Sequence, residues 1–152
     1  GAKELYYVGA AWGRDQIETL SRVLPICRDV ERINLSQNAI DDEALQLLLR
    51  PLAKSGSVPK LTHLNLCNNA IGDAGVNSLI DLLAHKRGPG VLPALEVVHI
   101  ERGNERTEYN PAGISPEVVS RLRQSVKAKV ERRLKGRPTS SISSRFTGNF
   151  TG

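Results

Sequence analysis

The sequence predicts an α/β solenoid: a short horseshoe of about four strand–helix repeats, with a parallel sheet on its concave face and a helix capping its C-terminal end. Two copies of one pattern predict it. Residues 61–71 follow the spacing L-x-x-L-x-L-x-x-N-x-L, with Asn69 in the asparagine position, and an apolar helical stretch follows. Residues 30–40 carry the same pattern 31 residues earlier, with Asn38 in that position. Two matched copies at one spacing predict a stack of similar units.

Each unit reads as a short strand, a turn and a helix. Leu64 and Leu66 alternate with Asn65, so the two leucines are expected to face the core while Asn65 faces outward. Asn69 marks the bend that follows, where its amide can satisfy backbone groups left unpaired. The stretch 76–83 then spaces its apolar residues as one face of a helix.

The outer units match the pattern less well. Residues 5–24 form a degenerate first unit, in which Trp12 is expected to plug the core. No polar segment shields the strand at 4–8, so we expect an incomplete solenoid that self-associates unless further repeats or a partner cover this edge. The last unit, around Val98, has Gly103 in the asparagine position.

Repeats of this length, with a full helix and the turn at 68–75, resemble the ribonuclease-inhibitor-like class of leucine-rich repeat proteins over residues 2–126. Members of that class are intracellular horseshoes that bind other proteins. The resemblance therefore implies a cytoplasmic protein with another protein as its partner and with no cofactor. The chain begins with Gly-Ala and has no methionine, so we expect a fragment of a longer chain or a subunit of a complex.

Charge divides the chain unevenly. Residues 1–110 carry a net charge of −2, whereas residues 111–152 carry +7. From Ser115 a helix is predicted by a serine cap followed by proline and glutamate. Its first turns, to Val126, are expected to cap the repeats. We therefore predict a repeat domain with its cap over 1–126, and a basic helix extension with a flexible tail over 127–152.

The predicted register places two outward-facing rows on the concave face, together with the loop at 101–111, which replaces the regular turn of the last unit. Partner-binding candidates are Tyr6, Arg32, Asn34, His63, Asn65, His99 and Arg102, of which Tyr6, Arg32 and Arg102 are anchors by residue type. The basic extension supplies Lys127, Lys129, Arg132, Arg133, Lys135 and Arg137.

One group on this face suggests chemistry. His63, Cys67 and His99 fall on adjacent predicted strands, within reach of a shared ion or of a thiolate–imidazole pair. A metal site normally needs a fourth ligand, and Cys67 in this position is expected to be half-buried, so we expect neither a metal site nor a catalytic site. The chain has no glycine-rich phosphate loop and no Ser/His/Asp pattern, so an enzyme is not expected.

Three functions remain open. The leading hypothesis is a protein-interaction module that binds through the concave face and the 101–111 loop. The second is a structural subunit of a large assembly, ribonucleoprotein, ciliary or cytoskeletal, anchored by the basic helix and tail. The third is direct binding of RNA or of an acidic membrane by that helix. Binding to phosphates weakens steeply with salt, which separates the third function from the first.

Overall fold

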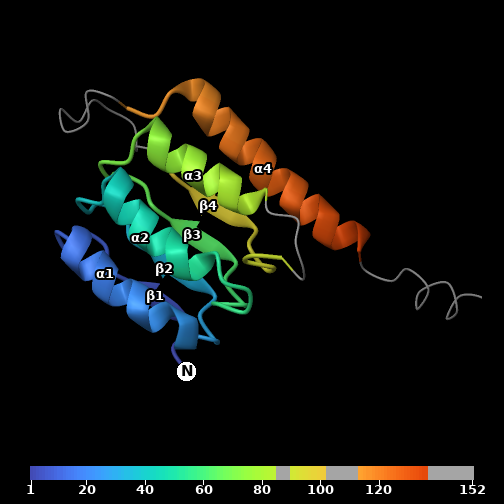
Figure 1. Ribbon diagram of the computed structural model, residues 1–152, viewed down its shortest axis with the longest axis horizontal. Helices are drawn as coiled ribbons and strands as arrows, with labels where there is room; N and C mark the ends of the chain where they lie inside the picture. Colours follow the sequence, from blue (N-terminus) through green and yellow to red (C-terminus); the bar gives the residue numbers. More distant parts are fainter. Residues whose placement is uncertain (85–89, 102–112, 137–152) are drawn as a thin grey trace, which may run out of the picture.

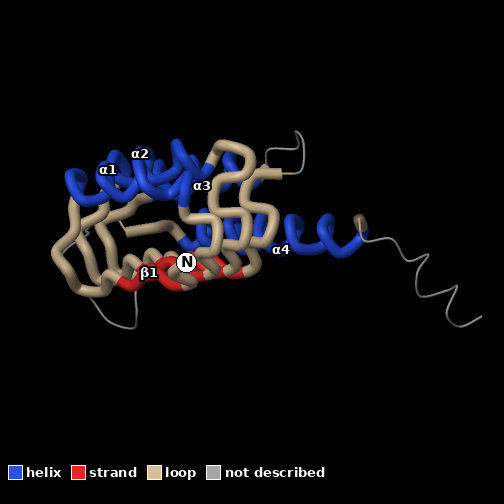
Figure 2. The backbone as a smooth tube through the Cα atoms, turned by 90° about the horizontal axis from the view of Figure 1, so that it is seen from below, coloured by secondary structure: helices blue, strands red, loops and turns tan. Residues whose placement is uncertain are grey.

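The computed structural model describes residues 1–84, 90–101 and 113–136. Four short parallel strands form one sheet in chain order, and helices α1–α3 lie side by side on one of its faces (Figures 1 and 2). Helix α4 follows the last strand and packs beside α3. The elements are β1 (Glu4–Tyr6), α1 (Arg14–Val23), the short 3-10 helix η1 (Leu24–Ile26), β2 (Arg32–Asn34), α2 (Asp42–Leu52), β3 (His63–Asn65), α3 (Asp73–Leu83), β4 (Val97–His99) and α4 (Pro116–Lys135). This confirms the predicted α/β repeat solenoid.

The strands pair in the register that the sequence predicts. Leu5, Ile33, Leu64 and Val98 face one another along the middle of the sheet. Ile33 and Leu64 are fully buried, while Leu5 and Val98 on the two outer strands are half-buried and pack against the same core. The outer strands have fewer neighbours, because β1 and β4 are the edges of the sheet.

The degenerate first unit makes the same turn as the two clear repeats. Gly9, Gln37 and Asn68 occupy equivalent places after their strands and have backbone φ angles of 61°, 58° and 56°. Such left-handed angles suit glycine and are tolerated by residues with short polar side chains. The shared turn places residues 5–24 in the array as a full repeat.

Asn38 and Asn69 tie neighbouring repeats together through backbone groups. The Asn69 amide donates to the carbonyls of Leu35 and Leu66 and accepts from the Ile40 N–H at 3.1 Å. Asn38 repeats this one unit earlier, because its amide oxygen accepts from the Trp12 N–H at 2.9 Å. The predicted turn role is confirmed, and each asparagine also reaches back into the preceding repeat.

Asp42 and Asp73 make a second set of ties, in the forward direction, which the repeat pattern did not predict. The Asp42 carboxylate accepts from the Gly72 N–H of the next repeat at 2.7 Å. Asp73 accepts from the Ser115 N–H at the start of the capping helix, also at 2.7 Å. The sequence feature that could have predicted these contacts is the presence of an aspartate at the same repeat position, in the first turn of each of the two helices.

Helix α4 turns its apolar stripe away from the repeats as it proceeds. The stripe from Val118 to Leu134 recurs every four residues, and each such step advances about 40° beyond a full helical turn. Accordingly, Val118 and Leu122 are buried, Val126 is half-buried, and Leu134 is 52% exposed. Figures 1 and 2 show the last turns of α4 extending past the sheet.

Contacts between α4 and the repeats continue beyond Val126. Arg133 donates to the Ala94 carbonyl at 3.0 Å and pairs with Glu96 at 2.7 Å. In these later turns the face of α4 that contacts the last repeat carries Lys129 and Arg133, because the apolar stripe no longer lies on that face.

In the part of the chain that is described, no helix is long and apolar enough to cross a membrane.

Candidate protein-binding surface

The concave face of the sheet collects the predicted binding residues on its four strands. Alternation along each strand turns the middle residue into the core and the flanking residues outward. One row contains Arg32 and His63, with Glu4 and Val97 at its ends, and the next contains Tyr6, Asn34, Asn65 and His99. These two rows are called the concave rows below. The predicted Arg102 and most of the 101–111 loop lie outside the described residues.

The two ends of the concave rows are open, and the middle is partly sheltered. Tyr6 is 69% exposed at the N-terminal edge, and His99 is exposed on β4. Asn34, His63 and Asn65 are half-buried on the two central strands, where neighbours stand on both sides. A large aromatic side chain held in solvent on a rigid strand is suited to pack against another molecule.

Carboxylates around the concave rows are each paired with a cation. Glu4 lies 3.6 Å from the Arg32 guanidinium, and Glu31 lies 3.5 Å from Lys3. Glu101, just after β4, pairs with Arg123 of α4. The acidic groups are therefore locally neutralised, and the surface presents mainly polar uncharged groups.

Asn34 and Asn65 have fixed amide orientations. The Asn34 Oδ1 atom accepts from the Ser36 N–H at 3.0 Å and from the Ser36 hydroxyl at 2.8 Å. The Asn65 Oδ1 atom accepts from the Cys67 N–H at 3.0 Å. Because both oxygens face their own turns, both amide nitrogens point away from them, and neither nitrogen has an acceptor among the described residues.

Thr62 contacts the ring of His63. The Thr62 hydroxyl lies 2.9 Å from the Glu31 carbonyl, to which it donates, and 2.8 Å from His63 Nδ1. Which of the two groups donates in the second contact depends on the tautomer of the ring.

Cys67 lies half-buried just after β3. Burial raises the pKa of the Cys67 thiol, which favours its protonated form, whereas a reactive cysteine needs its thiolate. Among the described residues no group of three His, Cys, Asp or Glu side chains could hold a metal ion. His63 is instead engaged with Thr62, as described above.

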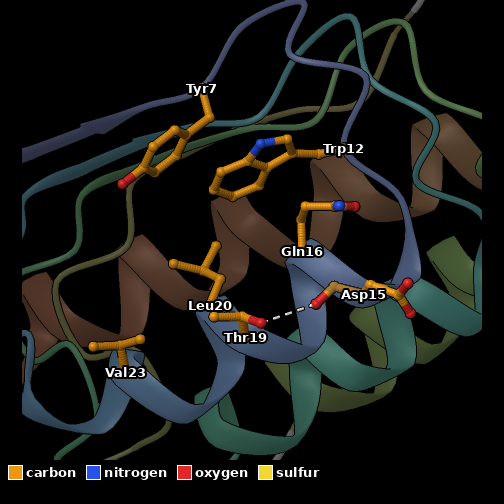
Figure 3. Close-up of a pocket in the computed structure, with 7 residues that line it drawn as sticks. All are labelled: Tyr7, Trp12, Asp15, Gln16, Thr19, Leu20 and Val23. Atoms are coloured by element: carbon orange, nitrogen blue, oxygen red, sulfur yellow. Dashed lines mark hydrogen bonds between the residues drawn. The ribbon is translucent and has the colours of Figure 1, made fainter.

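A second surface feature lies at the N-terminal edge, beyond the concave rows. A groove of about 300 Å³ runs between β1 and α1 and is lined by Tyr7, Trp12, Asp15, Gln16, Thr19, Leu20 and Val23 (Figure 3). The rings of Tyr7 and Trp12 stack with their centroids 4.1 Å apart. Trp12, which was expected to fill the core, is therefore half-buried and also lines this groove. In the sequence, the apolar residues Leu20 and Val23 of the helix are the features that could have indicated the groove.

The predicted basic extension divides into exposed and docked cations. Lys127 and Lys135 are exposed, whereas Lys129 and Arg133 are half-buried against the last repeat. Arg132 is exposed and also donates to the Leu83 carbonyl at 3.4 Å. Burial, with Arg132 and Arg133 close by, lowers the pKa of the Lys129 ammonium. Arg137 lies outside the described residues.

Comparisons with known proteins agree with this architecture. A family model described as a leucine-rich repeat matches residues 27–49 and 59–79, the two central repeats. A solved structure of the Leiomodin-1 Actin-Binding Site 2 is similar in fold, with a TM-score of 0.61 and 14% identity over 97% of this chain and 89% of that chain. A search of curated protein sequences found no match. The repeat pattern, the four-stranded parallel sheet and these two findings together support a leucine-rich repeat fold for this chain.

Proposed function

We propose that this chain is a protein-interaction module that binds another protein through the concave rows and the 101–111 loop. We also propose that it belongs to the ribonuclease-inhibitor-like class and works in the cytoplasm. The full helix in each repeat and the 31-residue step from Ile33 to Leu64 support that class. The fold family is one of interaction domains, and a protein as the kind of partner fits the similar leiomodin structure, which is an actin-binding site.

The observation that carries the proposal is the exposure of side chains in the concave rows, on the same strands whose middle residues are buried. Leu64 and Ile33 are fully buried, whereas Tyr6 is 69% exposed and Arg32 and His99 are exposed as well. The rigid parallel sheet holds these groups in fixed positions, so binding costs little conformational entropy.

The test is capture of partners from a lysate of the source organism with the full chain and with two variants. Tyr6→Ala removes the exposed aromatic ring, and Arg50→Ala removes an exposed cation from α2 on the opposite face as a control. We expect specific partners of the unmodified chain to be lost with Tyr6→Ala and kept with Arg50→Ala. Equal capture by all three proteins would contradict binding through the concave rows.

A second candidate function is that of a structural subunit of a large assembly, anchored by the basic helix and tail. The observation in its favour is the exposure of Lys127 and Lys135 on α4. The division into a repeat domain at 1–126 and an extension at 127–152 is proposed on the same ground. Lys127→Glu combined with Lys135→Glu should release such an assembly and leave partners of the concave rows bound. Loss of bound RNA alone, with steep salt dependence, would indicate phosphate binding instead.

A further inference from the structure

At the centre of the concave rows, the side-chain amide nitrogens of Asn34 and Asn65 donate no hydrogen bond to any other described residue. Asn34 and Asn65 are direct partners in the β2–β3 register, so they lie about one strand spacing, roughly 4.8 Å, apart. Their oxygens are held by Ser36 and Cys67, and this fixes both amides with their donors outward. Neither nitrogen is a buried unsatisfied atom, so both are open to solvent or to a ligand.

The groups around this pair add further donors. The Arg32 guanidinium lies in the adjacent row, and its pairing with Glu4 is an exposed contact at 3.6 Å, which water weakens. The Tyr6 hydroxyl stands at the end of the same row as the two asparagines.

The nearby carboxylates of Glu4, Glu31 and Glu101 each pair with a cation at an exposed position, so they add little net charge to this surface. The hydrogen-bonding groups without a partner among the described residues at the centre of the concave rows are the two amide nitrogens. A ligand that satisfies them must bring acceptors, and negative charge on those acceptors strengthens each bond.

We propose that the centre of the concave rows binds an acidic peptide segment of the partner, with a carboxylate accepting from Asn34 Nδ2 and Asn65 Nδ2 and another close to Arg32. This rests on the proposed function and specifies the partner's chemistry. A segment of a protein fits better than a nucleic acid, because the site offers neutral amides and one guanidinium rather than a cluster of cations.

The test uses a displayed library of random 12-residue peptides, selected against the full chain at 150 mM salt, and three isosteric variants. Asn34→Asp and Asn65→Asp keep an oxygen for the turn but replace the outward donor with a charged acceptor. Asn77→Asp makes the same change of charge on α3, where the Asn77 oxygen accepts from Arg121 and an aspartate can do the same. It is therefore the matched control.

We expect the selected peptides to be enriched in Asp and Glu. Asn65→Asp and Asn34→Asp should each weaken binding of a selected acidic peptide at least tenfold, while Asn77→Asp changes it less than twofold. Equal weakening by all three variants would show that the added negative charge alone weakens binding, wherever it is placed, and would overturn the proposal.

The selection also separates this inference from the proposed function. Peptides without acidic enrichment that still lose binding with Tyr6→Ala would overturn the acidic preference and leave the concave rows as the binding surface. Selected peptides that are insensitive to Tyr6→Ala, Asn34→Asp and Asn65→Asp would overturn both. Circular dichroism and melting of every variant show that each protein is folded, so a loss of binding reports on the surface.

Discussion

Two rows of asparagines stand four residues apart in the same repeats and do different work. Asn38 and Asn69 lie in the loops after the strands, and both ends of their amides bond to backbone groups of two repeats. Asn34 and Asn65 lie on the strands, and each uses its oxygen for a local turn while its nitrogen remains open. The same side chain is thus structural in one row and available in the other.

The difference follows from where the strand ends. On the strand, backbone groups are already paired across the sheet, so the side chain has little left to satisfy. In the loop, the chain has left the sheet, and carbonyls such as that of Leu35 would be buried without a partner. Position relative to the sheet therefore decides whether an asparagine stabilises the fold or faces a ligand.

The largest expected effect on stability comes from the loop row. Asn69 is 8% exposed, so Asn69→Ala removes the partner of the Ile40 N–H and of the Leu66 carbonyl and should cost roughly 1–3 kcal/mol of unfolding free energy. Asn38 is half-buried and water can replace part of its bonding, so Asn38→Ala should cost less, about 1 kcal/mol. Denaturant titration of both variants measures this order. A larger loss of unfolding free energy for Asn38→Ala than for Asn69→Ala would show that burial of the asparagine does not determine its contribution to stability.

The hydrogen bond between the Asp42 carboxylate and the Gly72 N–H of the next repeat offers an independent test of how much contacts between repeats contribute to stability. A methyl group at Gly75 would collide with the Asp42 carboxylate and come within 3.1 Å of Ile71. Gly75→Ala should therefore displace Asp42 from the Gly72 N–H and cost about 1–2 kcal/mol. Because alanine favours a helix over glycine, a gain in stability on urea unfolding would show that Asp42 moves aside freely.

The smallest expected effect belongs to the concave row. Asn65→Ala removes one bond to the Cys67 N–H, which solvent can replace, and should change stability by no more than about 0.5 kcal/mol. Its melting curve is compared directly with that of Asn69→Ala. A loss as large as that of Asn69→Ala would erase the distinction between the two rows.

The sequence was sufficient to predict the repeat architecture, because spacing and residue type determine it locally. The burial of Leu64 and the role of Asn69 follow from alternation and from the 31-residue step between Ile33 and Leu64. The places of β1 and β4 follow from steps of 28 residues from Leu5 to Ile33 and 34 residues from Leu64 to Val98. The prediction for α4 was less accurate, since an apolar stripe does not show that a four-residue spacing rotates away from the docked face. The contact of Arg133 with Ala94 depends on a loop whose path local patterns do not determine.

The candidate site was predictable in its members and not in its hydrogen bonding. Spacing alone placed Asn34 and Asn65 on the concave face. The direction of each amide depends on Ser36 and Cys67 two residues later, and the surroundings of His63 depend on its contact with the Thr62 hydroxyl. Such relations require coordinates, because they join atoms of several residues at once.

The most direct test of the difference between the rows is the exchange of asparagine side-chain amide protons with solvent, measured by NMR on the full chain. Hydrogen-bonded, sheltered protons exchange slowly, whereas protons open to water exchange quickly. We predict strong protection of the Asn69 amide, weaker protection of Asn38, and little protection of Asn34 and Asn65. Protection of Asn34 and Asn65 equal to that of Asn69 would contradict the account, because their donors would then already be in use.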